Sequence, residues 1–503
     1  MANTQTEVRP DHEIIIVGAG FSGIGLGIKL KKNYLHDFII LERADDLGGT
    51  WRDNTYPGLT VDIPSASYSY PFEPNPDWTR VYARGPELKA YADHCADKYD
   101  VRRHIRFKQS VTRATYDEAN NLWRITLADG ATLTARYFVS ATGALTAPKM
   151  PDIEGVESFK GKVIHTARWD HQHDLTNERV AVIGTGATAI QLIPEIVDKV
   201  QRIDVYQRTP IWLLPKMDAV IPEWLKRAYR FVPGLQKGMR LLCNFLTELW
   251  VGVGGAHFKQ FPWIFRWLEE QSIKHIRNQV NDPVLQAKLI PTYNHFCKRP
   301  SVSNVYYPVF NRASVELITD PIARITPTGI ETKDGKVREI DTLICATGFQ
   351  VFEPGTVPSC EIIGRGGQEI GDYWTKNRYK AYQGITVPGY PNYFMIFGPY
   401  AIASGSYFGM IDIQVRHFLR CLKAARQRAA NYVEIKQRAH DEDFARVIRQ
   451  RDNTVLYSGN CASAHTYYYD RNGDGPLLRP VTHFSMWLRS FTFNLNDYDF
   501  AAK

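Results

Sequence analysis

The chain has 503 residues, a length that exceeds what one hydrophobic core supports and suggests roughly two to four domains. Its 44% hydrophobic and 23% charged residues exclude a largely disordered chain. The net charge of +8 is modest and no long basic block appears, so nucleic acid is not an expected partner. The sequence shows neither a signal peptide nor an apolar run approaching a membrane span, so we expect a cytoplasmic protein with no transmembrane segment.

A first α/β unit is predicted from about residue 13 to residue 143. It opens with IIIVGAGFSGIG, in which an apolar strand leads into a turn containing Gly18, Gly20 and Gly23, and a helix follows. Glycines of this spacing let the backbone approach a pyrophosphate at the helix N-terminus. Glu42 ends the next predicted strand, where an acidic side chain can bind a free ribose hydroxyl.

A second α/β unit is predicted from about residue 163, with the turn VAVIGTGATAIQ and its Gly184 and Gly186. Here Arg208 stands at the position that Glu42 has in the first unit, and a base there suits a 2′-phosphate. The strand-like runs YFVSATG (137–143) and TLICATG (342–348) both end in Ala-Thr-Gly, as expected for strands that return to a cofactor crevice. The sequence therefore predicts that one chain binds FAD and NADPH.

The predicted fold is α/β, with two Rossmann-like dinucleotide-binding domains and a helical insertion in the NADP domain. After residue 210 the strand signals cease until about residue 293, and apolar residues recur at helical spacing. We expect these parts in chain order: the first part of the FAD domain (1–146), a linker with the first part of the NADP domain (147–212), the helical insertion (213–295), the second part of the NADP domain (296–380) and the second part of the FAD domain (381–503).

The insertion contains two apolar runs, LLCNFLTELWVGVGG (241–255) and FPWIFRWLEE (261–270). Apolar residues at helical spacing usually form core, so core or pocket wall is the favoured interpretation. A substrate channel and a membrane-surface contact remain alternatives.

The seven cysteines are scattered, and no two of them have CxxC spacing. This pattern argues against a disulfide framework, against a zinc site and against a dithiol flavin reductase. We expect no metal site.

The motifs together resemble type I Baeyer–Villiger monooxygenases, which belong to the flavin-containing monooxygenase superfamily. FKGKVIHTARWD, with His165 and Trp169, is similar to the fingerprint of that family. The resemblance covers most of the chain and fades in the helical insertion and in the last sixty residues. The other motifs that carry it are GGTWRDNTYPG (48–58) followed by Asp62, QRTP (207–210), KRP (298–300), VYYPVFNR (305–312) and ATGF (346–349).

The resemblance implies a role for individual residues. Arg299, paired with Asp62, is expected beside the flavin, where a permanent cation can stabilise an anionic oxygen adduct. His165 is expected to couple domain motion to turnover, and Trp169 of the fingerprint is counted with it among the catalytic residues. Lys298 and Thr209 are expected to join Arg208 on the 2′-phosphate. The remaining expected cofactor-binding residues are Phe21, Ser22, Arg43, Gly49, Thr50, Trp51, Tyr68, Gly143, Thr185, Ala187, Thr188, Gln191, Thr347 and Gly348, and Asp62 is counted with them.

The implied activity is that of a flavoprotein monooxygenase. With NADPH and O₂ it forms a C4a-peroxyflavin and inserts one oxygen next to a ketone carbonyl, which gives an ester or lactone. The expected partners are a small-molecule ketone and O₂, and the expected state is a monomer or small homo-oligomer. The nearest alternative is an S- or N-oxygenating flavin-containing monooxygenase. An electron-transfer flavoprotein or oxidase and a dinucleotide-sensing binding protein are more distant alternatives.

Overall fold

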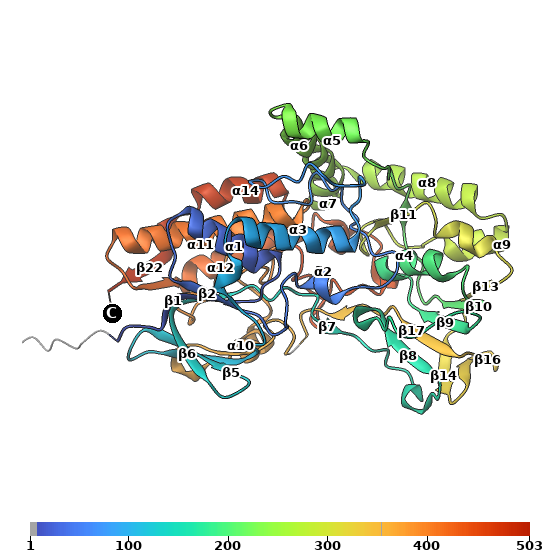
Figure 1. Ribbon diagram of the computed structural model, residues 1–503, viewed down its shortest axis with the longest axis horizontal. Coiled ribbons are helices and arrows are strands. Elements are labelled where there is room, and N and C mark those ends of the chain that lie inside the picture. The colour runs from blue at the N-terminus through green and yellow to red at the C-terminus, as the bar shows by residue number, and fades with distance from the viewer. Residues whose placement is uncertain (1–7, 354, 503) are drawn as a thin grey trace, which may run out of the picture.

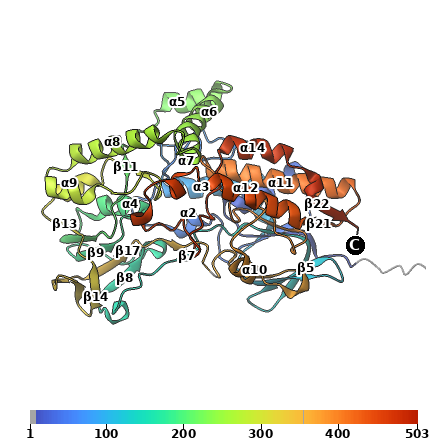
Figure 2. The same cartoon turned by 180° about the vertical axis from the view of Figure 1, so that it is seen from behind.

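The computed structural model describes residues 8–353 and 355–502. Two sheets lie side by side, with the first on the left and the second on the right of Figure 1. Helices cover one side of both sheets, and Figure 2 shows the same arrangement from behind. The α/β prediction is thereby confirmed.

The first sheet is built around β1 (His12–Val17), whose apolar residues are buried on both faces, as expected for a central parallel strand. Its strand order is β19-β4-β5-β6-β1-β2-β3, and β20 also pairs with β6. The other strands have these bounds: β2 Phe38–Leu41, β3 Ile105–Arg106, β4 Val111–Asp117, β5 Leu122–Leu127, β6 Thr132–Ser140, β19 Glu361–Ile363 and β20 Tyr393–Met395. The helices of this half are α1 Phe21–Lys32, α2 Thr50–Asp53, α3 Gly85–Lys98, α10 Ile370–Asn377, α11 Tyr407–Gln427, α12 Gln437–Arg451, α13 Val455–Ser458 and α14 His483–Thr492.

The second sheet is parallel throughout, in the order β13-β10-β9-β17-β8. Its strands are β8 Lys162–His165, β9 Arg179–Ile183, β10 Arg202–Tyr206, β13 Val315–Ile318 and β17 Thr342–Cys345. Helix α4 (Ala187–Ile196) follows β9 and packs through its apolar residues into the second core. A small antiparallel sheet, β14 Ile322–Thr326, β15 Gly329–Thr332 and β16 Val337–Glu339, lies at the lower right of Figure 1.

The helical insertion rises above the second sheet in Figure 1. Its segments are α5 Glu223–Phe231, α6 Leu235–Thr247, η4 Glu248–Val253, α7 Gly254–Ala256, α8 Pro262–Gln279 and α9 Pro283–Leu289. One strand was not expected in this part of the chain: β11 (Leu213–Leu214) pairs with β12 (Ser301–Val302). Two residues are too few to give a periodic signal, and the pairing depends on a contact across the whole insertion.

Two connections cross between the halves. β7 (Ala147–Pro148) carries the chain from the first sheet to the second, and β18 (Phe349–Gln350) carries it back. The two strands pair antiparallel and form a narrow ribbon. The chain then enters the first sheet at β19, which pairs with β4. The return to the first sheet thus begins before residue 381, the boundary expected from the sequence, because the short strand β19 has little signal of its own.

Cys297 and Cys461 form a disulfide across a sequence separation of 164 residues. The expectation of no disulfide was therefore wrong for this pair. Spacing along the chain carried no sign of it because the bond joins the insertion to the C-terminal segment. Among the described residues, Cys95, Cys243, Cys345, Cys360 and Cys421 are free thiols.

Candidate active site

A cavity of about 1550 Å³ lies between the two halves, at the carboxyl ends of parallel strands from both sheets. Val17 and Leu41 line it at the carboxyl ends of β1 and β2, and Ile183 and Tyr206 line it at the carboxyl ends of β9 and β10. Ligands of open α/β sheets bind in the crevice outside these ends. The topology therefore brings both predicted phosphate turns to one cavity.

Both turns need a glycine at their first position because the φ angle there is positive and a carbonyl oxygen lies too close for a Cβ. Gly18 has φ +106°, and a Cβ on it would lie 2.6 Å from the carbonyl oxygen of Ala141. Gly184 has φ +114°, and its Cβ would lie 2.5 Å from the carbonyl oxygen of Ala346. Each turn thus packs against the alanine of an Ala-Thr-Gly run, which explains why the sequence has both motifs twice.

Helices α1 and α4 begin directly after these turns, at the N-caps Gly20 and Gly186. In the described structure neither N-cap contributes a side-chain hydrogen bond, so the first backbone N–H groups of both helices are available to an anion. A Cβ on Gly186 would meet no atom within 4 Å, so the space in front of the turn is open. These two ends fit the pyrophosphates of two dinucleotides.

Glu42 is buried at the end of β2 and already has partners of its own. Its Oε2 accepts a hydrogen bond from the backbone N–H of Ala19 at 2.8 Å, and its Oε1 accepts one from Arg52 Nη1 at 3.0 Å. The carboxylate is thereby fixed beside the first turn, where it lines the cavity. Its remaining acceptor capacity fits a ribose hydroxyl.

Arg208 and Lys298 are two neighbouring cations at the second turn, and they repel each other. Burial and the charge of Arg208 lower the pKa of Lys298 to about 8. Both side chains line the cavity, and within the described part of the chain no carboxylate forms an ion pair with either. A dianionic phosphate placed between them would relieve this repulsion. The arrangement fits the 2′-phosphate of NADPH.

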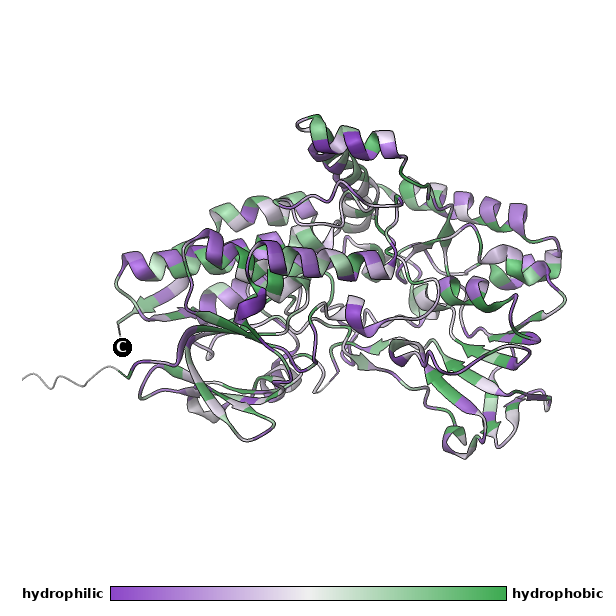
Figure 3. Cartoon of the chain, in the orientation of Figure 1, coloured by the Kyte–Doolittle hydropathy of each residue, from purple (hydrophilic) through white to green (hydrophobic). Residues whose placement is uncertain are grey.

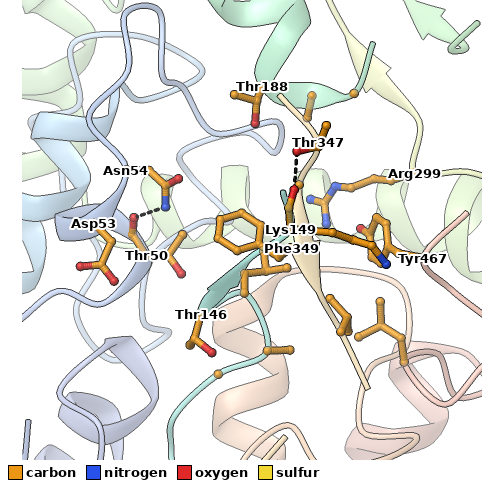
Figure 4. Close-up of a pocket in the computed structure, with 18 of the residues that line it drawn as sticks. Thr50, Asp53, Asn54, Thr146, Lys149, Thr188, Arg299, Thr347, Phe349 and Tyr467 are labelled. Carbon is orange, nitrogen blue, oxygen red and sulfur yellow. Dashed lines mark hydrogen bonds between the residues drawn. The ribbon is translucent and has the colours of Figure 1, made fainter. Parts of the chain in front are cut away.

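Arg299 lies in the same cavity and is held by Asp62. Its Nε and Nη2 donate to the two carboxylate oxygens, both at 2.9 Å. The charge of Asp62 raises the pKa of Arg299 above its ordinary value. The Arg299 side chain is 48% exposed, and Figure 4 shows the guanidinium pointing into the cavity next to Tyr467. The exposed surface therefore faces the cavity, where a ligand can reach it.

Tyr467 is a cavity residue that the sequence did not predict. It lines the cavity with His465 and Thr466, in the C-terminal segment that the disulfide ties to Cys297. Burial raises the pKa of Tyr467, so its hydroxyl stays protonated beside Arg299 at neutral pH. The only sequence feature that could have pointed to Tyr467 is the run of three tyrosines at 467–469. Such aromatic runs usually lie in the hydrophobic core, so the run did not predict a site residue.

Three of the predicted site residues do not line the cavity. Gly23 lies behind the first turn, where a Cβ would come 2.0 Å from the carbonyl oxygen of Gly18, so it serves helix packing. Trp169 packs against the hydrophobic core of the second sheet. His165 is buried at the end of β8, under the β7–β18 ribbon. The other predicted cofactor-binding residues all line the cavity: Phe21, Ser22, Arg43, Gly49, Thr50, Trp51, Tyr68, Gly143, Thr185, Ala187, Thr188, Gln191, Thr209, Thr347 and Gly348.

His165 lies against Phe349 of β18 and near the backbone of Lys149 and Gly348, which flank the ribbon. Its Nδ1 accepts a hydrogen bond from the backbone N–H of Ala167 at 3.1 Å, and its ring centroid is 6.4 Å from that of Phe349. Burial lowers the pKa of His165, and the backbone of Lys149 and Gly348 acts in the opposite direction. The imidazole is therefore neutral at physiological pH. Thr347 donates to the carbonyl of Lys149 across the same ribbon (Figure 4).

A protein named Baeyer-Villiger monooxygenase from Pseudomonas aeruginosa is 38% identical to the chain over 452 residues, which is 90% of this chain and 84% of that protein. Another of that name, from Streptomyces coelicolor, is 36% identical over 481 residues, or 95% of this chain and 90% of the relative. The chain belongs to the Baeyer–Villiger monooxygenase family. The resemblance inferred from the fingerprint, the turns and the KRP motif is thereby confirmed.

Structural comparison gives the same result for this Baeyer–Villiger monooxygenase. The solved structure of OTEMO in complex with FAD and NADP superposes with a TM-score of 0.85 at 28% identity and covers 98% of this chain and all of its own. The family profile described as pyridine nucleotide-disulphide oxidoreductase matches residues 15–230, the part that contains both glycine turns.

Proposed function

We propose that this Baeyer–Villiger monooxygenase uses NADPH and O₂ to insert one oxygen atom next to the carbonyl of a small-molecule ketone, giving an ester or lactone. The observation that carries the proposal is the Arg299–Asp62 pair, which lines a cavity between the two glycine turns. The first turn has the acidic Glu42 beside it and the second has the basic Arg208. Oxygen transfer from a C4a-peroxyflavin is part of this proposal. FAD and NADPH, when bound, supply the electrons and the site of O₂ activation.

The first half of the molecule provides the residues that would hold FAD. The α1 N-terminus would meet the pyrophosphate, and Glu42 would accept a hydrogen bond from a ribose hydroxyl. In the second half the α4 N-terminus, Arg208, Thr209 and Lys298 would hold NADPH. These assignments give one nucleotide to each half of the chain.

Arg299 supplies a fixed positive charge for the negative oxygen that develops during attack on the ketone. A guanidinium keeps its proton at every relevant pH, and the two bonds from Asp62 fix the plane of its fork. The cation is thus oriented before the substrate arrives, which is the condition for effective electrostatic stabilisation. Tyr467 adds a protonated hydroxyl to the same wall of the cavity.

His165 and Trp169 lie outside the cavity, so we assign them no contact with the reacting atoms. The place of His165 under the β7–β18 ribbon supports a positioning role, in which it links the second sheet to the connection between the halves. Trp169 packs this same segment onto the second core.

Product analysis tests the proposal. The purified holoenzyme is supplied with NADPH, O₂ and a panel of cyclic, linear, aromatic and steroid ketones, and products are identified by mass. Ester or lactone formed in proportion to NADPH consumed supports the proposal. A sulfoxide or N-oxide without ester would identify an S- or N-oxygenating monooxygenase instead. Hydrogen peroxide as the only product would identify an oxidase. No consumption of NADPH with any substrate would identify a dinucleotide-binding protein without enzymatic activity. The cytoplasmic location and the small oligomeric state stay predictions.

A further inference from the structure

Four helices form one outer edge of the molecule. α14, α6, α5 and α8 lie along the upper margin of Figure 1, and they occupy the same margin when the molecule is turned around in Figure 2. In Figure 3 hydrophobic residues recur along this margin on α14, α6 and the beginning of α8. Helices that cover the outside of a globular protein usually turn their apolar residues toward the core, so the exposure of these residues decides what this margin does.

Helix α6 is turned with its polar side inward. Gln236 and Arg240 are buried, with Gln236 Nε2 donating to the Asn75 carbonyl at 2.5 Å and Arg240 Nη1 donating to the Ser69 carbonyl at 2.6 Å. Burial lowers the pKa of Arg240 to about 10, so the inward cation has an energetic cost. Apart from Lys237, the exposed long side chains of α6 are apolar: Leu235, Met239, Leu241, Leu242, Phe245 and Leu246. Leu249, in the following segment η4, is exposed as well.

Helix α14 continues this apolar surface. Phe484, Trp487, Leu488 and Phe491 recur at helical spacing and are all exposed. Glu248, which follows α6, accepts hydrogen bonds from the backbone N–H groups of His483 and Phe484 at the start of α14. The two helices are therefore fixed to each other, and their apolar stripes lie on connected elements.

Exposed aromatic side chains extend the surface onto the other two helices. Trp224 and Phe231 stand seven positions apart on α5, and Trp263 and Trp267 four positions apart on α8. Trp267 stacks on Trp250 with a centroid distance of 5.0 Å. We call the exposed apolar residues of α5, α6, α8 and α14 together, with Leu249, the apolar edge. Monomeric proteins rarely expose so many large apolar side chains on one side.

Positive charge flanks the apolar edge. Arg227, Lys237, Lys259 and Arg266 are exposed, and none of them has a carboxylate within ion-pair distance among the residues that the structure describes.

Negative charge on the same helices is mostly consumed by internal contacts. Glu223 pairs with Lys226, Glu269 accepts a hydrogen bond from Asn294, and Glu248 caps α14. Glu270 is exposed. The surroundings of the apolar edge are therefore cationic.

From this combination we infer that the apolar edge binds the surface of an anionic phospholipid membrane. Leu, Phe and Trp beside Lys and Arg are the composition of helices that lie in the membrane interface, with apolar side chains among the acyl chains and cations at the headgroups. In the described residues no helix is long and apolar enough to span a bilayer, which fits attachment in the plane of one leaflet. A second copy of the chain is disfavoured because symmetric pairing would bring the two cationic rims together. The inference does not depend on which ketone the enzyme oxidises.

Vesicle flotation tests the inference with the purified holoenzyme. We expect the enzyme to float with vesicles of phosphatidylcholine mixed with phosphatidylglycerol, and to float less with phosphatidylcholine alone or at high salt. The double variant Leu242→Ser/Phe245→Ser should bind at least about tenfold more weakly, since it removes two outward apolar side chains. Neither residue lines the cavity, so activity on a water-soluble ketone and the flavin absorbance should be unchanged and show that the variant is folded.

The matched control is Val337→Ser, another exposed apolar residue, on β16 at the lower right of Figure 1, away from the four helices. It should float as the parent enzyme does. Equal flotation of the parent and the Leu242/Phe245 variant would overturn the inference, as would no flotation of the parent with anionic vesicles. A dimer in light scattering that the variant dissociates, without vesicle binding, would assign the apolar edge to a second copy instead. An inactive ketone panel would leave the flotation result unaffected.

Discussion

Arg299 and Asp62, 237 positions apart in the chain, form a two-bond ion pair with both N–O distances at 2.9 Å. The pair joins the segment after the helical insertion to the loop that follows α2. It therefore orients the cation of the candidate active site and fixes the insertion to the first half of the molecule.

Replacing Arg299 with alanine should lower the rate of ester formation by about 10²–10³-fold, the usual cost of losing one preorganised stabilising group. FAD should remain bound, since the first glycine turn and Glu42 are untouched. Arg299→Lys should recover only part of the rate, because an ammonium cannot make both bonds to Asp62. The measurement is kcat for product with FAD content from absorbance. Arg324→Ala, which removes a surface ion pair with Glu331, is the control. A near-normal rate in Arg299→Ala would remove the central argument for ketone oxygenation.

Arg208→Ala and Lys298→Met should each raise the KM for NADPH by about tenfold or more and change the KM for NADH little, because only NADPH carries the 2′-phosphate. Steady-state kinetics with both cofactors gives the comparison. Equal effects on NADPH and NADH would show that the two cations bind some other part of the nucleotide.

The pH dependence of NADPH binding should follow Lys298. Its pKa of about 8 means that the ammonium is present below pH 8 and lost above it. The phosphate binds the protonated form, so the KM for NADPH should rise as pH increases through about 8, while the KM for NADH stays level. Lys298→Met should abolish this rise, and its persistence in that variant would assign the titration to another group.

His165→Ala should leave FAD bound and flavin reduction nearly normal, and should lower the fraction of NADPH that yields product. The reason is its place under the ribbon that joins the halves, away from the cavity. Anaerobic stopped-flow reduction and the ratio of product to NADPH consumed separate the two effects. His171→Ala, at a histidine that bonds Thr55, serves as control. Unchanged coupling in His165→Ala would leave His165 with a packing role only.

Loss of the Cys297–Cys461 disulfide should destabilise the protein by about 2–5 kcal/mol, since the bond closes a long loop. Cys297→Ser and Cys461→Ser should lower the Tm by similar amounts, and a reductant should lower the Tm of the parent but not of either variant. Cys360→Ser, at a free and half-buried thiol, should keep the response to reductant. Free thiols at both positions in the oxidised protein, detected by alkylation and mass, would contradict the bond.

Local chemistry made much of the site predictable. The glycine turns, Glu42 and Arg208 obey short-range rules of strand, turn and helix, and the structure brings all of them to one cavity. The disulfide and Tyr467 depend on contacts between distant segments, for which one sequence contains no spacing rule. The two apolar runs of the insertion were expected to form core. Ile264, Phe265 and Leu268 on α8 are buried as expected, but the apolar residues of α6 are exposed. Periodicity shows that a helix has two faces and does not show which face meets the protein.

The antiparallel contact of Phe349 with Pro148 and of Gln350 with Ala147 also bears on how the enzyme moves. Both backbone crossings between the halves run through this narrow ribbon, but the Cys297–Cys461 bond and the Arg299–Asp62 pair also connect the insertion side of the molecule to the first half. A change of angle at the ribbon that kept the disulfide intact would have to strain or break the Arg299–Asp62 pair, so the orientation of the active-site cation is coupled to the angle between the two halves.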